Sequence, residues 1–241
     1  MNNRFSFVSV LQLAAAGVIG VLTLVGCSPQ PTINTSVSAE RTYDGLYPIE
    51  NTLVDRAWAR ADLDLGGYTK IKFEAAGINF RPTRTRTGSR MAHGSSETAF
   101  HISQANRERL RATFAEAFRA EMPKLERFEI TDQSGPDVLL VRGALVDVVS
   151  HVPEEPIDGA DIYLDTVGEA TLLIEMVDSE TGAVLLRAAD RRAAEYQNLN
   201  LPSNIVTNWQ ELRRLADFWA GQLRQRLDDI ANQVILAEDA I

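Results

Sequence analysis

The chain has 241 residues, of which 45% are hydrophobic and 24% are charged, a mix that is typical of a folded globular protein. This composition excludes wholesale disorder and a polytopic membrane protein, and the length favours one domain with appendages. The net charge of −9 argues against nucleic acid as a partner, because phosphate backbones attract positive surfaces. A single cysteine, Cys27, excludes an intramolecular disulfide and a cysteine-cluster metal site.

The first 26 residues have the organisation of a targeting segment. A weakly basic start that includes Arg4 precedes an apolar run over residues 5–25. The end of this run, Leu24-Val25-Gly26-Cys27, resembles the bacterial lipobox, in which the cysteine receives a diacylglyceryl group. The alternative is an uncleaved transmembrane anchor, because roughly 20 apolar residues can span a bilayer. Three glycines, and a lone cysteine at the position where lipidation needs one, favour the signal peptide.

We therefore predict a lipoprotein signal peptide over residues 1–26, a lipidated tether over residues 27–45 and one periplasmic domain over residues 46–241. Acyl chains such as palmitate on Cys27 would anchor the protein stably in a membrane. An aspartate directly after the cysteine would resemble an inner-membrane retention signal, but this position holds Ser28. We therefore expect the outer membrane, with the domain facing the periplasm. Residues 28–45 contain Pro, Thr and Ser without hydrophobic periodicity, which predicts a flexible tether.

The first half of the domain is predicted to contain few regular elements. Apolar residues near Trp58 have helical spacing, so residues 46–67 are predicted to form a short helix or an irregular packed segment. Residues 68–74 alternate between polar and apolar and predict the first strand, followed by a loop to His101. A helix is predicted from Ser103, its N-cap, to Met122, and a short strand over residues 128–131.

Residues 138–149 form a nearly continuous apolar run, which predicts a central strand buried on both faces. Arg142 and Asp147 have opposite parity in this run, so regular alternation would bury one of the two charges. We therefore expect a bulge at Gly143 that brings both charges to one side.

The last third of the chain predicts a hairpin and a long helix. Residues 167–178 and 183–192 flank a short connection that contains Gly182. The helix is predicted from Asn208 to Asn232, with Thr207 as the N-cap of a capping box and an apolar stripe along one face. The order of elements predicts an α+β fold, in which a mostly antiparallel sheet is packed by two main helices in a two-layer sandwich.

A positive patch stands out in this acidic protein, with four arginines in ten residues and no acid among them: Arg81, Arg84, Arg86 and Arg90. Guanidinium groups suit phosphate and carboxylate, so one interpretation is a site for an anionic envelope lipid or polymer. The other is a solvated loop, or pairing with the protein's own acids between Glu154 and Glu169. Both interpretations stay open.

Catalytic and metal-binding patterns are absent from the sequence. It contains no GxSxG, HExxH, Walker or GxGxxG motif. The three histidines, His93, His101 and His151, lack the spacing of a helical metal site, and the acidic stretch lacks the pattern of a calcium loop. We therefore expect no catalytic residue, no metal and no cofactor.

Several strand-and-turn motifs resemble a family of bacterial lipoproteins catalogued as domain of unknown function 3313. They lie in residues 68–71, 135–147, 168–182 and 190–192. The resemblance covers most of residues 40–235 and implies an envelope lipoprotein, but no activity and no functional residue besides Cys27. The leading hypothesis is a non-catalytic, lipid-anchored protein that binds an envelope protein partner or helps assembly. The alternatives are the anion-binding module and an unrecognised hydrolase.

Overall fold

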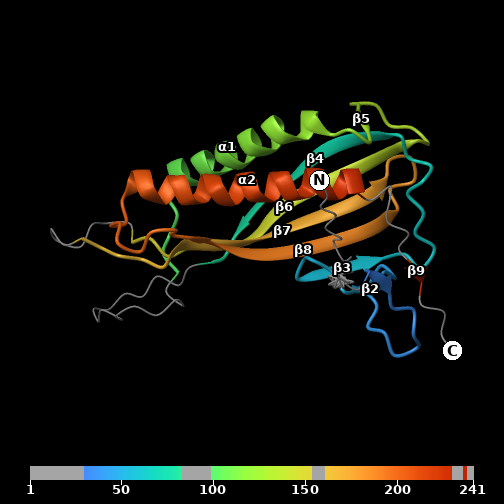
Figure 1. Ribbon diagram of the computed structural model, residues 1–241, viewed down its shortest axis with the longest axis horizontal. Helices are drawn as coiled ribbons and strands as arrows, with labels where there is room; N and C mark the ends of the chain where they lie inside the picture. Colours follow the sequence, from blue (N-terminus) through green and yellow to red (C-terminus); the bar gives the residue numbers. More distant parts are fainter. Residues whose placement is uncertain (1–29, 83–98, 154–160, 230–235, 238–241) are drawn as a thin grey trace, which may run out of the picture.

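The computed structural model describes residues 30–82, 99–153, 161–229 and 236–237, and in these residues two helices cover one face of a twisted sheet (Figure 1). The nine described strands have the order β5-β4-β6-β7-β8-β3-β2-β1-β9. The pairs β4–β5, β4–β6 and β1–β9 are parallel, and the other neighbours are antiparallel. The predicted α+β fold, with a mostly antiparallel sheet and two main helices, is confirmed.

The sheet begins earlier in the chain than expected. β1 (Thr32–Ile33) pairs with β2 (Tyr47–Glu50), and Ile33 is only 1% exposed. A backbone bond from Thr42 to Leu46 closes the connection between the two strands, and Leu46 is buried as well. The expectation of a tether without structure up to residue 45 is therefore wrong for residues 30–45. Strand pairing and one buried isoleucine outweigh the polar composition around them.

Residues 46–67 contain β2 and β3 (Arg56–Ala59) instead of the expected short helix or irregular packed segment. Ala57 and Ala59 alternate into the core, and β3 pairs with β8 over its whole length. The apolar spacing in this short segment fits a helix or a strand equally well. The free edge of β8, which lies far along the chain, decides between them.

β4 (Lys70–Phe80) confirms the predicted strand but continues to Phe80, through residues that were expected to form a loop. It pairs in parallel with β6, and its first residues pair with the short β5 (Glu129–Ile130). Gly77 has φ of +107° at one of two register shifts in this pairing. The shifts let the strand continue although its sequence alternates poorly.

β6 (Val138–Ser150) lies between β4 and β7, as predicted for a central strand. The bulge is not at Gly143, which pairs regularly with Ile174; the irregularity lies between Val146 and Val149, where Asp147 has φ of +56°. Aspartate tolerates this left-handed conformation better than most residues. The predicted position is wrong, but the bulge does bring Asp147 to the same face of the sheet as Arg142, where both side chains form ion pairs.

The predicted hairpin is confirmed as β7 (Thr166–Asp178) and β8 (Val184–Glu195). Gly182 has φ of +71° in the connection, a conformation that glycine adopts without steric cost. The Asp178 carboxylate accepts the backbone N–H of Thr181 at 2.7 Å. The turn therefore depends on one glycine and one carboxylate.

The two helices lie side by side and begin at the same end of the molecule (Figure 1). α1 (Gln104–Glu121) has the predicted N-cap Ser103 and is followed by the short 3₁₀ helix η1 (Met122–Lys124). α2 (Ile205–Asp229) begins earlier than predicted, because the Asn204 side chain accepts the N–H groups of its first turn. The predicted cap at Thr207 is therefore wrong. The predicted end at Asn232 lies outside the described residues, and β9 (Leu236–Ala237) is the last described element.

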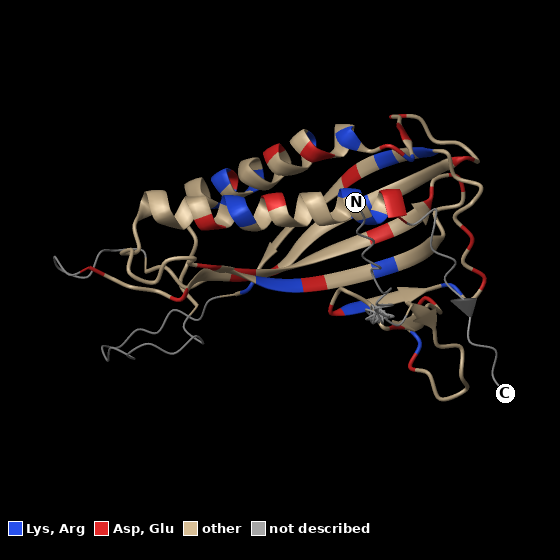
Figure 2. Ribbon diagram, in the orientation of Figure 1, with Lys and Arg blue, Asp and Glu red and all other residues tan. Residues whose placement is uncertain are grey.

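Charged residues recur along the central strands (Figure 2), and their side chains pair with one another on the face of the sheet opposite the helices. Directly opposed residues on β4, β6, β7 and β8 alternate in sign and form ion pairs, and a residue before β2 extends the row: Glu74, Arg142, Glu175, Arg187 and Asp44. The Asp44 carboxylate raises the pKa of Arg187 further above its ordinary value, so this guanidinium stays charged. The apolar core therefore lies on the helix side of the sheet.

Candidate functional site

A pocket of about 490 Å³ opens between the helices and the sheet, at the end of the molecule where both helices begin. This volume is within the range of small-molecule sites. Most of the side chains that line it are apolar, and they come from four elements: Leu110 and Phe114 of α1, Leu212 and Leu215 of α2, Leu145 and Val148 of β6, and Val167 and Ala170 of β7.

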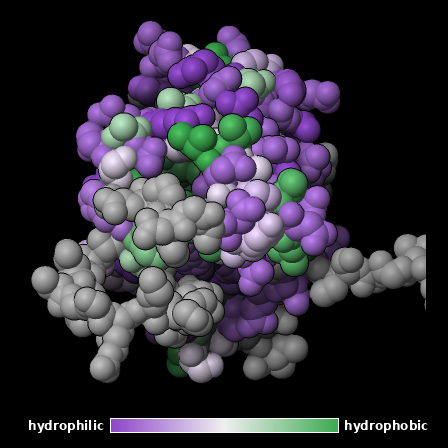
Figure 3. Space-filling view, turned by 90° about the vertical axis from the view of Figure 1, so that its left-hand side faces the viewer, coloured by the Kyte–Doolittle hydropathy of each residue, from purple (hydrophilic) through white to green (hydrophobic). Residues whose placement is uncertain are grey.

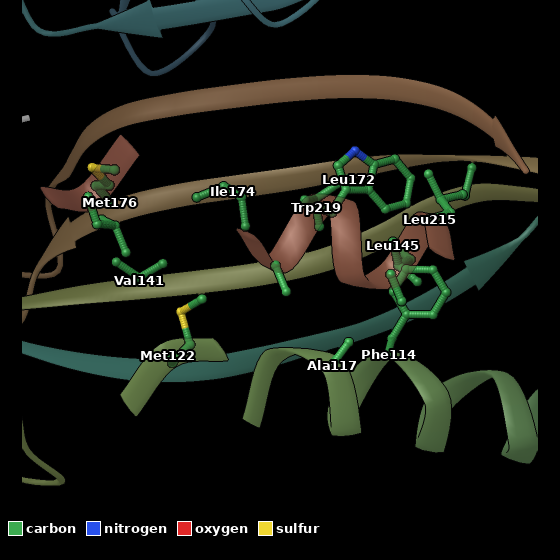
Figure 4. Packing of buried hydrophobic residues seen from close by; sticks show 14 of the residues in the cluster. Phe114, Ala117, Met122, Val141, Leu145, Leu172, Ile174, Met176, Leu215 and Trp219 are labelled. Carbon is green, nitrogen blue, oxygen red and sulfur yellow. The ribbon is translucent and has the colours of Figure 1, made fainter. Parts of the chain in front are cut away.

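The inner wall of the pocket is part of the main core. Figure 4 shows Phe114, Leu145 and Leu215 close together, although they come from α1, β6 and α2. Phe114 also contacts Trp219, with ring centroids 5.9 Å apart. The Trp219 indole N–H is satisfied by the carboxylate of Asp190 at 2.8 Å. This wall is thus made of buried side chains that are held from three sides.

Two irregularities of the sheet meet at the pocket. The bulge at Asp147 makes Val148 and Val149 consecutive buried residues, and both line the pocket. Opposite them, a Cβ atom on Gly168 would lie 2.2 Å from the carbonyl oxygen of Val149, so only glycine fits there. Bulges are frequent next to functional sites because they redirect side chains. Here the bulge and the glycine shape the sheet side of the pocket.

Along each helix the lining changes from an asparagine to apolar residues toward the core, whereas both polar and apolar residues line the rim. Along α1, Asn106 in the first turn precedes the apolar Leu110 and Phe114. Along α2, Asn208 precedes Leu212 in the same way. Ser150, Asp161, Ser203 and Asn204 also line the pocket. An amphipathic ligand with its apolar part inside would match this gradient.

Asn208 is the most buried polar side chain of the site, with 8% of its surface exposed. Its Oδ1 accepts the hydroxyl of Ser203 at 3.0 Å and the hydroxyl of Tyr196. Both hydrogen bonds of this side chain end at its oxygen, and its nitrogen has no hydrogen bond to the described residues. Every fully buried side-chain nitrogen or oxygen in the described residues has a partner, so this nitrogen is not fully buried. The amide nitrogen thus keeps some accessible surface, and Asn208 lines the pocket.

Several ionisable groups near the pocket are paired or neutral, whereas Asp161 lines it as an exposed acid. Glu169 at its edge forms ion pairs with Arg191 and, at 3.9 Å, with Arg81. His151 follows the lining residue Ser150, and its Nδ1 is 2.7 Å from the hydroxyl of Thr166. Burial lowers the pKa of His151, so its ring is neutral at neutral pH. The described residues contain no cluster of acids, histidines or cysteine that could hold a metal ion.

Apolar side chains are also exposed around the mouth. Ile205 and Val206 in the first turn of α2 are 65% and 71% exposed, and Leu199 and Leu201 lie just before it. Figure 3, which views this end, shows hydrophobic side chains gathered near its centre within a mostly hydrophilic surface. Exposed apolar groups at the rim of an apolar pocket are typical of a binding site.

The residues that the sequence singled out lie beside this pocket or outside the described residues. Cys27, Arg84, Arg86 and Arg90 belong to the second group. Arg81 is described, and its guanidinium binds the carboxylate of Asp147, with Nε–Oδ1 at 2.7 Å. Arg81 therefore pairs with the protein's own acids, mainly with Asp147, which lies outside the predicted stretch, and at 3.9 Å with Glu169, which lies in it. The anion-binding site stays a prediction.

Sequence reasoning missed the pocket because its lining comes from four separate elements. The available signal was the pair Ile205–Val206, which lies outside the apolar stripe of the last helix and is exposed.

No helix within the described residues is long and apolar enough to cross a membrane.

Comparison with known proteins identifies a family and some remote structural similarity. The family model described as "Protein of unknown function (DUF3313)" matches residues 35–223. A search of the curated proteins gives no match. A PelC dodecamer from Paraburkholderia phytofirmans is similar over 70% of this chain and 92% of its own, with 14% identity and a TM-score of 0.31.

Two further solved structures show the same remote similarity. Protein XCC0632 from Xanthomonas campestris matches 73% of this chain and 94% of its own, with 10% identity and a TM-score of 0.34. Rare lipoprotein B from Shewanella oneidensis matches 65% of this chain and 94% of its own, with 13% identity and a TM-score of 0.23. At these TM-scores we base no argument on any of the three.

Proposed function

The chain belongs to the DUF3313 family of proteins of unknown function, and from its site we propose that it is a non-catalytic envelope lipoprotein that binds an apolar ligand. In this proposal Cys27 carries the lipid anchor, the outer membrane holds the protein, and the domain faces the periplasm. The lipobox-like end of the first segment supports the anchor and its location. The apolar pocket supports the binding function.

The observation that carries the proposal is the continuity of apolar surface from the exposed rim into the core. Ile205 at the rim and Leu215 deep in the core line the same pocket. Burial of apolar surface contributes about 25 cal/mol per Å², so a ligand that fills this space gains affinity without needing any charge. Exposed side chains around the mouth also offer a contact surface for an envelope protein partner that delivers or receives the ligand.

The arrangement of polar groups supports binding over catalysis. A hydrolase needs a nucleophile beside a base, or a bound metal. His151, which follows the lining residue Ser150, is bonded to Thr166, and the serines that line the pocket, Ser150 and Ser203, bond to Val152 and Asn208. Pocket residues therefore orient one another and present an apolar surface.

A neutral dye whose fluorescence rises in apolar surroundings, such as Nile red, tests the proposal. The mature chain with Cys27→Ser contains every described residue and is studied without detergent. We expect the dye to bind saturably and Leu212→Trp to weaken binding at least about tenfold, because the indole fills the space that the ligand needs.

Leu223→Trp is the matched control, since Leu223 packs against the core from the same helix but does not line the pocket. Its dye binding should equal that of the parent chain. Equal dye binding by the Leu212→Trp variant, in a chain that circular dichroism shows to be folded, would contradict the proposal.

A further inference from the structure

We propose that the pocket binds an acyl chain that is joined to its headgroup through an uncharged ester or amide carbonyl, and that Asn208 donates a hydrogen bond to this carbonyl. The inference rests on the proposed function and adds the chemical class of the ligand. Three observations support it: the shape of the pocket, the state of Asn208 and the charge of the lining.

The pocket is elongated along the helices. From Asn106 to Phe114 it follows α1 for about 12 Å, and from Asn208 to Leu215 it follows α2 for about 10 Å, at 1.5 Å per residue. On both helices an asparagine lines the pocket one turn before the apolar residues that reach the core, and on α2 the apolar Ile205 also lines it further out. A linear apolar chain with a polar group at its outer end matches this arrangement.

Asn208 is placed to recognise that polar group. Tyr196 and Ser203 hold its Oδ1, which fixes the orientation of the amide and leaves its nitrogen without a partner among the described residues. An N–H group in a buried, mostly apolar site costs free energy while it lacks an acceptor. A ligand carbonyl would supply that acceptor at the point where the lining changes from polar to apolar.

The charge of the lining favours an uncharged carbonyl over a carboxylate or a phosphate. The described lining contains two acids, Asp161 and Glu169, and no Lys or Arg. The arginines nearest to Glu169, Arg81 and Arg191, are already paired with it and with Asp147. An anion beside Asn208 would therefore meet no cation in the described lining, which is costly, and the Arg109 guanidinium lies nearby, 4.3 Å from the ring centroid of the lining residue Trp209.

Brominated probes can test this inference, because bromine quenches tryptophan fluorescence at short range. Trp209 lines the pocket and Trp219 contacts its inner wall, whereas Trp58 lies on β3. The probes are a brominated monoacylglycerol, the brominated fatty acid and a brominated alkane of equal chain length, each below its aggregation concentration. The protein is the mature chain with Cys27→Ser.

We expect all quenching to saturate, with the monoacylglycerol binding about tenfold more tightly than the alkane or the fatty acid, because only it gains the hydrogen bond without burying a charge. Asn208→Asp keeps the acceptor for Tyr196 and Ser203 but removes the donor, and should abolish the preference for the ester over the alkane. Asn208→Leu should do the same. Asn200→Asp adds the same charge at an exposed position that does not line the pocket, and should leave the preference intact.

The possible outcomes separate this inference from the proposed function. Quenching by no probe overturns both. Equal binding of ester and alkane, or a preference that survives Asn208→Asp, overturns the role of Asn208 and leaves the apolar pocket standing. Fatty acid binding as tight as ester binding overturns the requirement for an uncharged carbonyl. A variant whose pocket has collapsed would bind neither the ester nor the alkane. The expected result, in which alkane binding is retained and only the preference for the ester is lost, therefore cannot come from a misfolded variant.

Discussion

At the scale of single residues, a few carboxylates fix the ends of long strands. Asp178 ends β7 and accepts bonds from the Thr181 backbone at 2.7 Å and from the Tyr68 hydroxyl at 2.7 Å. The bonds from Thr181 and Tyr68 lower the pKa of Asp178 to about 2. Burial, together with the same carboxylate, raises the pKa of Tyr68 to about 12. One side chain thus joins the hairpin turn to the segment before β4.

Replacing this carboxylate should make the free energy of unfolding depend less on pH between about pH 4 and pH 2. The pKa of Asp178 is about 2 in the folded state and ordinarily 3.8, so its contribution is complete above about pH 4 and is lost as the pH falls toward 2. We expect Asp178→Ala to lower the free energy of unfolding by about 1 kcal/mol at pH 7, as for a lost helix cap, and by less near pH 2. Urea denaturation at both pH values measures this.

The neighbouring Glu180 provides the control for this prediction, because it is an exposed acid in the same turn. Glu180→Ala should change stability by no more than about 0.5 kcal/mol at either pH. If Asp178→Ala costs the same at both pH values, the assigned role of the ionised carboxylate is wrong.

At the scale of elements, β6 and β7 show how an irregularity shapes the candidate site. A regular β6 would place Asp147 on the helix side of the sheet. The bulge instead directs it to Arg81 and Arg191 and turns both Val148 and Val149 inward. The close approach of the Gly168 backbone to Val149 belongs to the same feature. Shape and charge at the sheet side of the pocket therefore have a common origin.

Gly168→Ala tests this element directly. The added methyl would lie 2.2 Å from the Val149 carbonyl oxygen, so the two strands must separate. We expect a loss of about 1 to 3 kcal/mol in the free energy of unfolding, as for other overpacked sites, measured by urea denaturation.

Gly143 supplies a comparison within β6. A methyl on Gly143 would meet only the Cδ1 atom of Ile174, at 3.4 Å, and that side-chain end can move. Gly143→Ala should therefore cost less than about 1 kcal/mol. If the two substitutions cost the same, close backbone approach is not the reason for glycine at 168.

At the scale of the whole molecule, the start of the described chain and the pocket lie at opposite ends. β1 and β9 are neighbours at one end, whereas both helices begin at the other (Figure 1). Thr32 follows Cys27 by five residues, which span at most about 18 Å. A lipid on Cys27 would thus hold the β1 end near the membrane and leave the pocket at the opposite end of the described fold.

Lipidation at Cys27 is the prediction that belongs to this scale. In cells supplied with a labelled fatty acid, the parent protein should carry the label and appear in the membrane fraction. Cys27→Ala should lose the label, because the chain has no other cysteine. Label retained on the Cys27→Ala protein would show that the anchor lies elsewhere or that the label is bound in the pocket. Extraction with organic solvent separates these two results, because it removes only a bound ligand.

The sequence by itself determined the features that depend on local chemistry. Alternation and continuous apolar runs identified β4, β6 and the hairpin, and Ser103 identified the start of α1. Opposite parity of Arg142 and Asp147 required a bulge in β6. These predictions succeeded because each rests on neighbours within one element, where side-chain periodicity is fixed by the backbone.

Only the tertiary structure decided the features that depend on distant partners. The short strands β1 and β3 form because β2 and β8 offer free edges for pairing. The bulge lies at Asp147 because its carboxylate there forms ion pairs with Arg81 and Arg191. The pocket has the same origin, since its lining comes from four elements that the chain brings together. Binding sites of this kind are invisible in local patterns, because a cavity is a property of packed surfaces and of no single segment.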